Sequence, residues 1–393
     1  MKARANRLAI ETRAIHAGQE PDPLTGAVVQ PIYTASTFVQ DGIGRNKGYL
    51  YSRARNPTRA TLEACLADLE GARAAFAFPT GLSAAATILE LLDAGGRIVA
   101  HHDLYGGIYR LLSKVRNRSA GLDVAFVNFS DTEALRRAVT PETRMLWFET
   151  PSNPLLEIVD IAEIVRIAGG HGALTVCDNT FSSPYCQRPL EMGVDIVMHS
   201  ATKFLNGHSD LLAGVVALSE KVDDRLVEEL AFIQNSVGAV LDPVSSATLL
   251  RSLKTLAVRM DRHVENAAAI AAFLDANRAR LGIEKLIYPG LESHPGHAIA
   301  KRQMKGFGSM ISFAVEGGVD RADRIARELE LFAFAVSLGG VESLIQHPAS
   351  MTHKILPPER RAMLGVTDNL LRLSVGIEHV DDLIADLERT MTR

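Results

Sequence analysis

Short apolar runs alternate with amphipathic stretches through the first half of the chain. The apolar runs predict strands at 74–78, 97–101, 123–127, 145–149, 174–178, 195–199 and 215–218. The stretches between them predict helices at 81–92, 106–115, 131–138 and 161–168. Alternation of this kind is typical of an α/β fold with a mostly parallel sheet covered by helices on both faces. The ligand crevice of such a sheet is expected at the carboxyl ends of its strands.

A clear helix start precedes this region. Asn56-Pro57 combines an N-cap residue with proline at the first helical position. Leu62, Leu66 and Leu69 then repeat at helical spacing, and Gly71 predicts the end of the helix.

The pattern divides the chain into three predicted parts. Residues 1–55 lack a sustained period but carry enough apolar and aromatic residues to make pure disorder a poor interpretation, so we expect an N-terminal arm. Residues 56–243 form the main α/β domain. Residues 244–393 are expected to form a smaller C-terminal α/β domain, with one long helix at 245–276 and a final helix at 380–391.

Composition and charge restrict the class of protein. The chain has 393 residues, of which 47% are hydrophobic and 22% charged, as in ordinary globular proteins. A net charge of −4 gives no reason to expect nucleic acid or an anionic membrane as a partner. Three cysteines without a CxxC pair favour a reducing compartment, and we see no secretory signal and no apolar run of transmembrane length. We therefore expect a cytoplasmic protein.

Lys203 is the first candidate for chemistry. It follows a predicted buried strand and stands beside Ser200 and Thr202. One interpretation is a lysine at a strand end that reaches solvent. The other is an amine held in a cleft, where desolvation lowers its pKa and allows a Schiff base, with the two hydroxyls holding a phosphate.

Other strand ends carry complementary groups. Asp178 ends one predicted strand, Asn153 follows another, and Tyr105 follows a third. Gly81 and Leu82 lie at a strand-to-helix turn, where free backbone N–H groups favour a phosphate, although a plain tight turn has the same sequence. Amine, carboxylate, aromatic ring and phosphate donors together match the requirements of pyridoxal 5′-phosphate.

Longer motifs around these residues resemble one family. The chain is similar to the Cys/Met-metabolism family of pyridoxal-phosphate enzymes, fold type I proteins such as cystathionine γ-synthase, cystathionine γ-lyase and methionine γ-lyase. The resemblance covers nearly the whole chain. The motifs that carry it are Tyr51-Ser-Arg53, Asn56-Pro-Thr-Arg59, Asp103-Leu-Tyr-Gly-Gly107, Glu149-Thr-Pro-Ser-Asn-Pro154, Asp178-Asn-Thr180, Ser200-Ala-Thr-Lys203, Asn206-Gly-His208, Ser337-Leu-Gly-Gly-Val-Glu-Ser343, Met351-Thr-His353 and Leu371-Arg-Leu-Ser-Val-Gly-Ile-Glu378.

The resemblance implies a role for each matched position. Lys203 would be the Schiff-base and proton-transfer lysine, Asp178 would pair with the ring nitrogen, and Tyr105 would stack on the ring and act near the leaving group. The implied cofactor-binding residues are Tyr51, Arg53, Gly81, Leu82, Tyr105, Asp178, Thr180, Ser200, Thr202 and Lys203. The implied substrate-binding residues are Asn153, Val336, Ser337, Thr352 and Arg372, and no metal is implied.

The family also implies an assembly. Tyr51 and Arg53 would reach the phosphate of the neighbouring subunit, which gives the arm a function. A site completed by a neighbour requires at least a dimer, and the resemblance implies a homotetramer built as a dimer of active dimers.

Two departures bear on the substrate. Val336 stands where members that handle cystathionine usually carry a glutamate, and Gly107 stands where methionine γ-lyases carry a cysteine. A valine cannot pair with the distal ammonium of cystathionine, so the distal pocket is expected to be less acidic. We predict γ-elimination from a homoserine- or homocysteine-type amino acid such as cystathionine, methionine or an O-substituted homoserine. γ-Replacement and β-elimination of cystathionine stay open.

Alternatives from other classes have less support. Ser200-Ala-Thr-Lys203 also fits the S-x-x-K pattern of serine acyl-enzymes, but the Ser-Asp-Asn motif of that class is absent from the sequence. A zinc enzyme lacks a histidine pair at ligand spacing with a glutamate, and His101-His102-Asp103 is interpreted as a strand end. A non-enzymatic binding protein would require loss of Lys203, Asp178 or Arg372, and all three are present.

Overall fold

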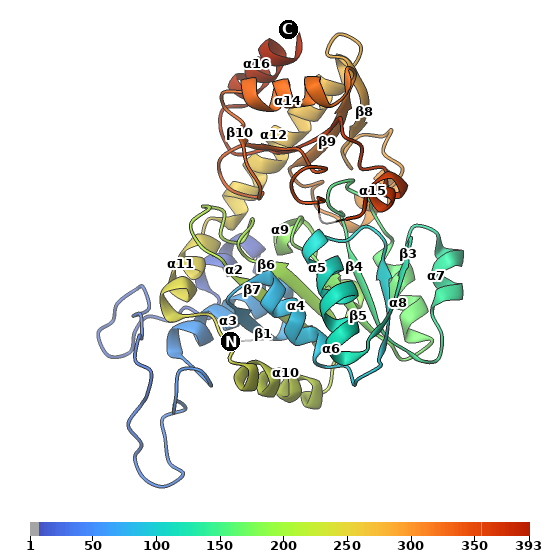
Figure 1. The fold of residues 1–393 in the computed structure, drawn as a ribbon. Helices are drawn as coiled ribbons and strands as arrows, with labels where there is room; N and C mark the ends of the chain where they lie inside the picture. Colours follow the sequence, from blue (N-terminus) through green and yellow to red (C-terminus); the bar gives the residue numbers. More distant parts are fainter. Residues whose placement is uncertain (1–7, 355) are drawn as a thin grey trace.

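The structure, a computed structural model, describes residues 8–354 and 356–393 and contains two sheets (Figure 1). The larger sheet has seven strands in the order β1-β7-β6-β5-β4-β2-β3. Only β7 runs antiparallel to its neighbours, which confirms the predicted mostly parallel sheet. The strands are β1 (Ala72–Phe78), β2 (Arg97–His101), β3 (Asp123–Val127), β4 (Thr143–Glu149), β5 (Leu174–Asp178), β6 (Ile196–Ser200) and β7 (Gly214–Ser219).

The helices of this part begin at the polar residues that the sequence offers. The side chains of Asn56, Thr80, Asp131 and Asp160 each accept a backbone N–H at the start of a helix. The predicted helices are confirmed, although the one predicted at 106–115 continues from α5 into a π-helical turn at Leu111–Arg116. The helices are α3 (Pro57–Glu70), α4 (Gly81–Leu89), α5 (Gly106–Arg110), α6 (Asn117–Ala120), α7 (Thr132–Ala138), α8 (Ile161–Gly169), α9 (Ser183–Cys186) and α10 (Asp224–Val237), with a 3-10 turn at Pro189–Met192.

The core lies on both faces of the larger sheet. Successive residues of a strand point to opposite faces. Phe148 and Cys177 accordingly pack into one cluster and Trp147 and Val176 into another, all without solvent exposure. Because both faces are covered, these strands are continuously apolar rather than alternating.

The prediction of one long helix at 245–276 is wrong in one respect. The structure has two helices there, α11 (Pro243–Leu253) and α12 (Leu256–Ala276). The carbonyl oxygen of Ser252 accepts from the Thr255 N–H at 3.2 Å and the Thr255 hydroxyl at 3.1 Å. It also accepts from the Arg259 guanidinium at 3.0 Å. These contacts replace the i→i−4 bond that a continuous helix would make.

Helix α12 leads into the second part of the molecule (Figure 1). Its five-stranded sheet has the order β10-β11-β12-β9-β8. The strands are β8 (Ile283–Ile287), β9 (Met310–Val315), β10 (Ala333–Phe334), β11 (Leu344–Gln346) and β12 (Leu370–Ser374). The helices are α13 (His297–Gln303), α14 (Gly318–Glu328), α15 (Pro358–Leu364) and α16 (Val380–Met391), the last as predicted.

The N-terminal segment is mostly extended. A short helix that the pattern did not predict, α2 (Ile10–His16), packs on α3 through an Arg13–Asp68 ion pair of 2.6 Å. The chain then projects from the body as a long loop up to α3 (Figure 1). Residues 1–7 of the predicted arm lie outside the described residues.

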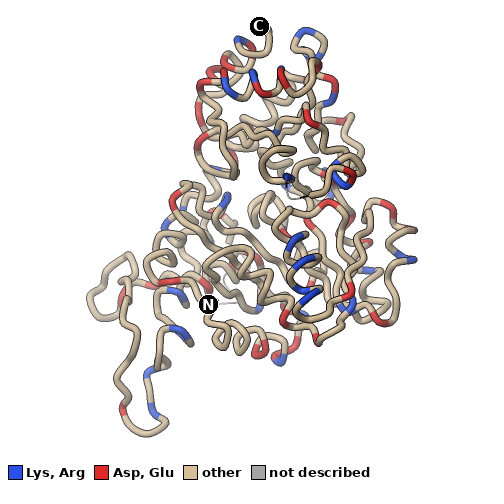
Figure 2. Tube along the Cα trace, viewed as in Figure 1, with Lys and Arg blue, Asp and Glu red and all other residues tan. Residues whose placement is uncertain are grey.

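Charged residues of both signs are interspersed over the whole molecule (Figure 2). Among the described residues, no helix combines the length and the apolar character needed to cross a bilayer.

Arg259 ties α12 to the larger sheet. Its buried guanidinium donates to the carbonyl oxygens of Phe204 at 2.7 Å and Leu205 at 3.3 Å, in the turn that follows Lys203. A Cβ at Gly207, which has a φ of +72°, would lie 2.0 Å from Arg259 Nη1. The turn that presents Lys203 is therefore fixed by a contact from the second half of the chain.

We expect Arg259→Met to lower the free energy of unfolding by about 3 kcal/mol, because three carbonyl oxygens lose their buried donors. Urea-induced unfolding of the holoprotein measures the change. The matched control is Arg262→Met on the same helix, where the side chain is half exposed and pairs with Glu265. That change should cost less than about 1 kcal/mol. Equal effects of the two substitutions would contradict the assigned role.

Candidate active site

A cavity of about 460 Å³ lies at the carboxyl ends of β4, β5 and β6, where the topology predicts a ligand crevice. Part of its lining comes from the second half of the chain, from Val336 to Arg372. Of the residues named from the sequence, those that line it are Gly81, Leu82, Tyr105, Asn153, Asp178, Thr180, Ser200, Thr202, Lys203, Val336, Ser337, Thr352 and Arg372.

Lys203 points its amine at the second half of the chain. Its Nζ donates to the Ser337 hydroxyl at 2.6 Å, whereas an S-x-x-K acyl-enzyme would need Ser200 as the partner. Burial, together with the nearby positive charge of Arg372, lowers the pKa of Lys203 to about 8. A large fraction of this amine is therefore neutral and nucleophilic near pH 8.

Two carboxyl groups line the cavity side by side. Asp178 and Glu149 are paired residues of neighbouring parallel strands. Asp178 Oδ1 accepts from the Thr180 N–H at 3.0 Å and from the Thr180 hydroxyl, which leaves Oδ2 for a donor in the cavity. Burial raises the pKa of Asp178, and the hydrogen bonds from Thr180 oppose that rise.

Glu149 is a functional candidate that the sequence reasoning missed. Its two oxygens accept from the backbone N–H groups of Tyr105 at 2.9 Å and Asn153 at 2.8 Å. Burial and the charge of Asp178 raise the pKa of Glu149 well above the usual range. Two carboxyl groups buried side by side disfavour double ionisation, so the two groups titrate as a coupled pair. A signal existed, because Glu149 ends β4 as Asp178 ends β5.

The start of α4 forms an anion-binding corner. The Thr80 hydroxyl accepts from the Ser83 N–H at 3.0 Å and the Thr80 carbonyl oxygen from the Ala84 N–H. The amides of Gly81 and Leu82 lie ahead of these bonds and line the cavity. A Cβ at Gly81 would lie 3.0 Å from Ser200 Cα and Cβ, so glycine permits the close approach of α4 and β6. Helix amides with the Ser200 and Thr202 hydroxyls nearby fit a phosphate.

Arg372 provides a buried positive charge. It is 2% exposed, and its guanidinium donates to three neutral oxygens: Asn153 Oδ1 at 2.6 Å, the Ser337 carbonyl oxygen at 2.7 Å and Gln346 Oε1 at 2.8 Å. Its buried Nε has no hydrogen-bond partner among residues 8–354 and 356–393. Burial lowers the pKa of Arg372 to about 9. A guanidinium surrounded by neutral oxygens fits the carboxylate of an amino acid.

Gln346 is a second residue that the sequence reasoning missed. Besides accepting from Arg372, it donates to the Thr352 hydroxyl at 2.7 Å. It thereby connects two of the predicted substrate-binding residues.

The mouth of the cavity is apolar. Val336 and Leu212 line it with exposed fractions of 55% and 63%, and Tyr105 is 40% exposed. A Cβ at Gly107 would lie 2.5 Å from Tyr105 Cε1, so the absence of a side chain at 107 allows this position of the ring. The acidic groups of the cavity, Glu149 and Asp178, are both buried.

Tyr51 and Arg53 do not join the cavity of their own chain. They lie at the base of the arm, with the guanidinium carbon of Arg53 5.7 Å from the centre of the Tyr51 ring. Their predicted contact with a phosphate therefore requires a second copy of the chain.

Known proteins of one family match this chain over nearly its whole length. The family model described as Cys/Met metabolism PLP-dependent enzyme matches residues 11–392. A cystathionine beta-lyase of Coxiella burnetii is 52% identical, with 97% of each chain covered. A cystathionine gamma-lyase of Dictyostelium discoideum is 47% identical, with 99% of each covered. A crystal structure of cystathionine gamma-lyase from Lactobacillus plantarum, complexed with L-serine, superposes with a TM-score of 0.93 at 45% identity and 98% coverage of both chains.

We expect Lys203 of the protein freed of cofactor to titrate near pH 8, because burial and the charge of Arg372 disfavour its protonated form. An ordinary lysine titrates near pH ~10.4. Since the neutral amine is the nucleophile, acylation of Lys203 should rise steeply between about pH 7 and 9. Competitive labelling followed by peptide mass spectrometry measures this midpoint.

Arg372→Met serves as the comparison variant. It removes one positive charge, so the midpoint of Lys203 should move to higher pH. A wild-type midpoint close to that of an ordinary lysine would contradict the predicted shift.

Proposed function

The chain belongs to the Cys/Met metabolism PLP-dependent enzyme family, and we propose that it cleaves cystathionine by γ-elimination, with the uptake of one water, to cysteine, 2-oxobutanoate and ammonia. The predicted family, the α/β fold of type I and the pyridoxal 5′-phosphate cofactor are confirmed. The observation that carries the proposal is one cavity that combines the Lys203 amine, its pKa lowered to about 8, with the Arg372 guanidinium among neutral partners.

The cavity has a group for each part of the cofactor. When bound, pyridoxal 5′-phosphate supplies an aldehyde for an amine and a ring that accepts the electrons of a broken bond. Asp178 would hold a proton on the ring nitrogen through its open Oδ2. Gly81, Leu82, Ser200 and Thr202 would bind the phosphate, and the half-exposed Tyr105 would cover the ring.

The substrate is held at its amino-acid end. Arg372 and Asn153 would bind the α-carboxylate, which places Cα near Lys203. The Lys203 amine would take the Cα proton, would have to release it to the bound cofactor, and only then, neutral again, could take a proton from Cβ, as loss of a γ substituent requires. Ser337, which accepts from Nζ at 2.6 Å, positions the amine, and Tyr105 would donate a proton to the leaving sulfur.

The apolar mouth leaves the far end of the substrate in water. Cystathionine carries a second amino-acid group beyond its sulfur. Val336 and Leu212 are exposed at the mouth, so this distal group stays hydrated there rather than paired with a buried acid. The valine at 336 in place of a glutamate therefore lowers the affinity for cystathionine without preventing its binding.

β-Elimination is a second candidate. The two ends of cystathionine are a cysteine half and a homocysteine half. The bond that breaks depends on which half binds Arg372: the homocysteine half gives γ-elimination and the cysteine half gives β-elimination. The Coxiella burnetii relative named cystathionine beta-lyase favours this alternative.

Holoenzyme incubated with cystathionine should release 2-oxobutanoate and cysteine, measured by chromatography of the products. Lys203→Ala should lower kcat by about 10³-fold or more, because the amine that moves both protons is gone. Lys221→Ala, at a half-exposed lysine that pairs with Asp195, is the control and should retain activity.

The products decide between the alternatives. Pyruvate and homocysteine would establish β-elimination instead. Faster synthesis of cystathionine from an O-acyl-homoserine and cysteine would establish γ-replacement. Release of neither oxo acid from cystathionine, methionine or an O-acyl-homoserine would disprove a lyase.

We further propose that the arm of residues 1–55 packs on a second copy and that the enzyme is a homotetramer of two active dimers. Leu24, Val39 and Ile43 expose 90%, 91% and 105% of their side chains on this arm, which favours a partner surface over solvent. In this assembly the main domain is 56–243 and the smaller one 244–393. The three buried free cysteines support a cytoplasmic location.

Co-expression of two inactive variants tests the shared site. Lys203→Ala and Arg53→Ala chains should each be impaired alone. In a mixed dimer one site has both its own Lys203 and the partner's intact arm, so random pairing should restore about a quarter of wild-type activity. No restoration would show that each chain completes its own site.

A further inference from the structure

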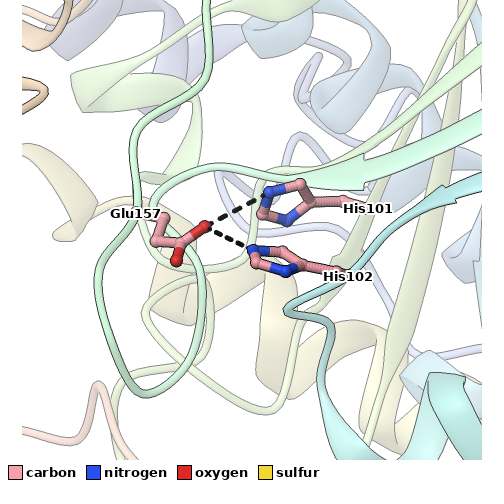
Figure 3. A group of neighbouring side chains, drawn as sticks. All are labelled: His101, His102 and Glu157. Atoms are coloured by element: carbon pink, nitrogen blue, oxygen red, sulfur yellow. Dashed lines mark hydrogen bonds and ion pairs between the residues drawn. The ribbon is translucent and has the colours of Figure 1, made fainter. Parts of the chain in front are cut away.

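Two histidines and a glutamate converge outside the active-site cavity (Figure 3). His101 ends β2, His102 follows it, and Glu157 comes from the segment between β4 and α8. The sequence interpretation treated His101-His102-Asp103 as a strand end, because Glu157 is 55 residues away from His102 along the chain. The fold brings this carboxylate to both imidazoles.

Two of the three separations between the donor atoms match a metal site. Glu157 Oε2 lies 3.0 Å from His102 Nε2 and 3.4 Å from His101 Nε2, and the three donor atoms lie within 4.8 Å of one another. A tetrahedral Zn²⁺ with ligands at about 2.0–2.1 Å separates its ligand atoms by about 3.3 Å. The two distances to Glu157 are close to this value.

The hydrogen bonding of His101 defines its free nitrogen. Its Nδ1 lies 3.1 Å from the Asp103 carbonyl oxygen, and since a carbonyl only accepts, Nδ1 carries the hydrogen. The buried Nε2 then presents a lone pair toward Glu157, and it has no hydrogen-bond partner among the described residues. A lone pair facing a carboxylate oxygen is repulsive unless a proton or a metal cation lies between them. A backbone carbonyl that fixes the tautomer in this way is typical of metal-binding histidines.

We propose that His101, His102 and Glu157 bind one Zn²⁺ ion, with water as the fourth ligand. Two nitrogens and one carboxylate suit zinc better than magnesium or calcium. The side chains of His102 and Glu157 are 18% and 27% exposed, which gives the ion access and allows the rotation that brings the two imidazoles together. Arg360 donates to the His102 carbonyl oxygen at 3.1 Å, and its charge lowers the affinity for a cation.

The ion would join two loops of the active site. His102 lies three residues before Tyr105, and Glu157 lies four residues after Asn153. The Ser152 hydroxyl already connects the same loops, since it donates to the Asp103 carboxylate and accepts from the Glu157 N–H. Bound zinc therefore acts as a second cross-link, which stabilises the fold and takes no part in the chemistry at Lys203.

The test uses holoenzyme stripped with a chelator and kept free of amino acids, which bind zinc themselves. Calorimetric titration with ZnCl₂ should give one site per chain, and zinc should raise the melting temperature. Substitution of Co²⁺ should produce the visible absorption of a tetrahedral site. Glu157→Gln and His102→Ala should each weaken zinc binding by at least ~10-fold.

Two controls make the outcome decisive. His379→Ala removes an exposed histidine that faces Asp381 at 3.8 Å, and it should leave zinc binding unchanged. The absorbance of the bound cofactor verifies that each variant is folded. Equal zinc uptake by wild type, Glu157→Gln and His102→Ala would overturn the proposal, as would a loss in His379→Ala as large as in the ligand variants.

Discussion

The burial of the Arg372 guanidinium is the constraint on which the site depends. It lies on β12 of the smaller sheet and donates to Asn153 beside the larger one, so it joins the two halves of the chain. It also donates to the carbonyl oxygen of Ser337, whose hydroxyl accepts from Lys203. A charge buried among neutral oxygens is costly, and a bound carboxylate offsets that cost. The Arg372 guanidinium therefore contributes both to the binding of an amino acid and to the packing of the two halves against each other.

The cavity is lined by buried groups of both charge types. Lys203 and Arg372 are its basic groups, and Asp178 and Glu149 are its acidic groups. Burial shifts the pKa values of all four groups toward their neutral forms. Ligands of the opposite charge favour the ionised forms, so the cavity is pre-organised for an anionic substrate group and a cationic ring nitrogen.

Contacts from distant segments hold the reactive groups in place. Arg259 on α12 fixes the turn after Lys203, and Glu149 fixes the backbone of both Tyr105 and Asn153. The His101–His102–Glu157 cluster lies behind the same two loops. Contacts of this kind limit the motion of the catalytic groups. A displacement of ~1 Å of such a group can lower the reaction rate substantially.

The sequence by itself determined the strands and helices of the larger sheet, since apolar periodicity and caps such as Asn56 act over a few residues. It also pointed to Lys203 and Asp178, because strand ends meet at one edge of a parallel sheet, whereas Arg372 was identified through the family resemblance. Only the tertiary structure decided the break at Thr255, the roles of Glu149 and Gln346, and the meeting of Glu157 with His101. The roles of Glu149, Gln346 and Glu157 depend on partners that are distant along the chain, and such contacts leave no local periodic signal. The break at Thr255 is closed by Arg259, whose side chain is held by the distant carbonyl oxygens of Phe204 and Leu205.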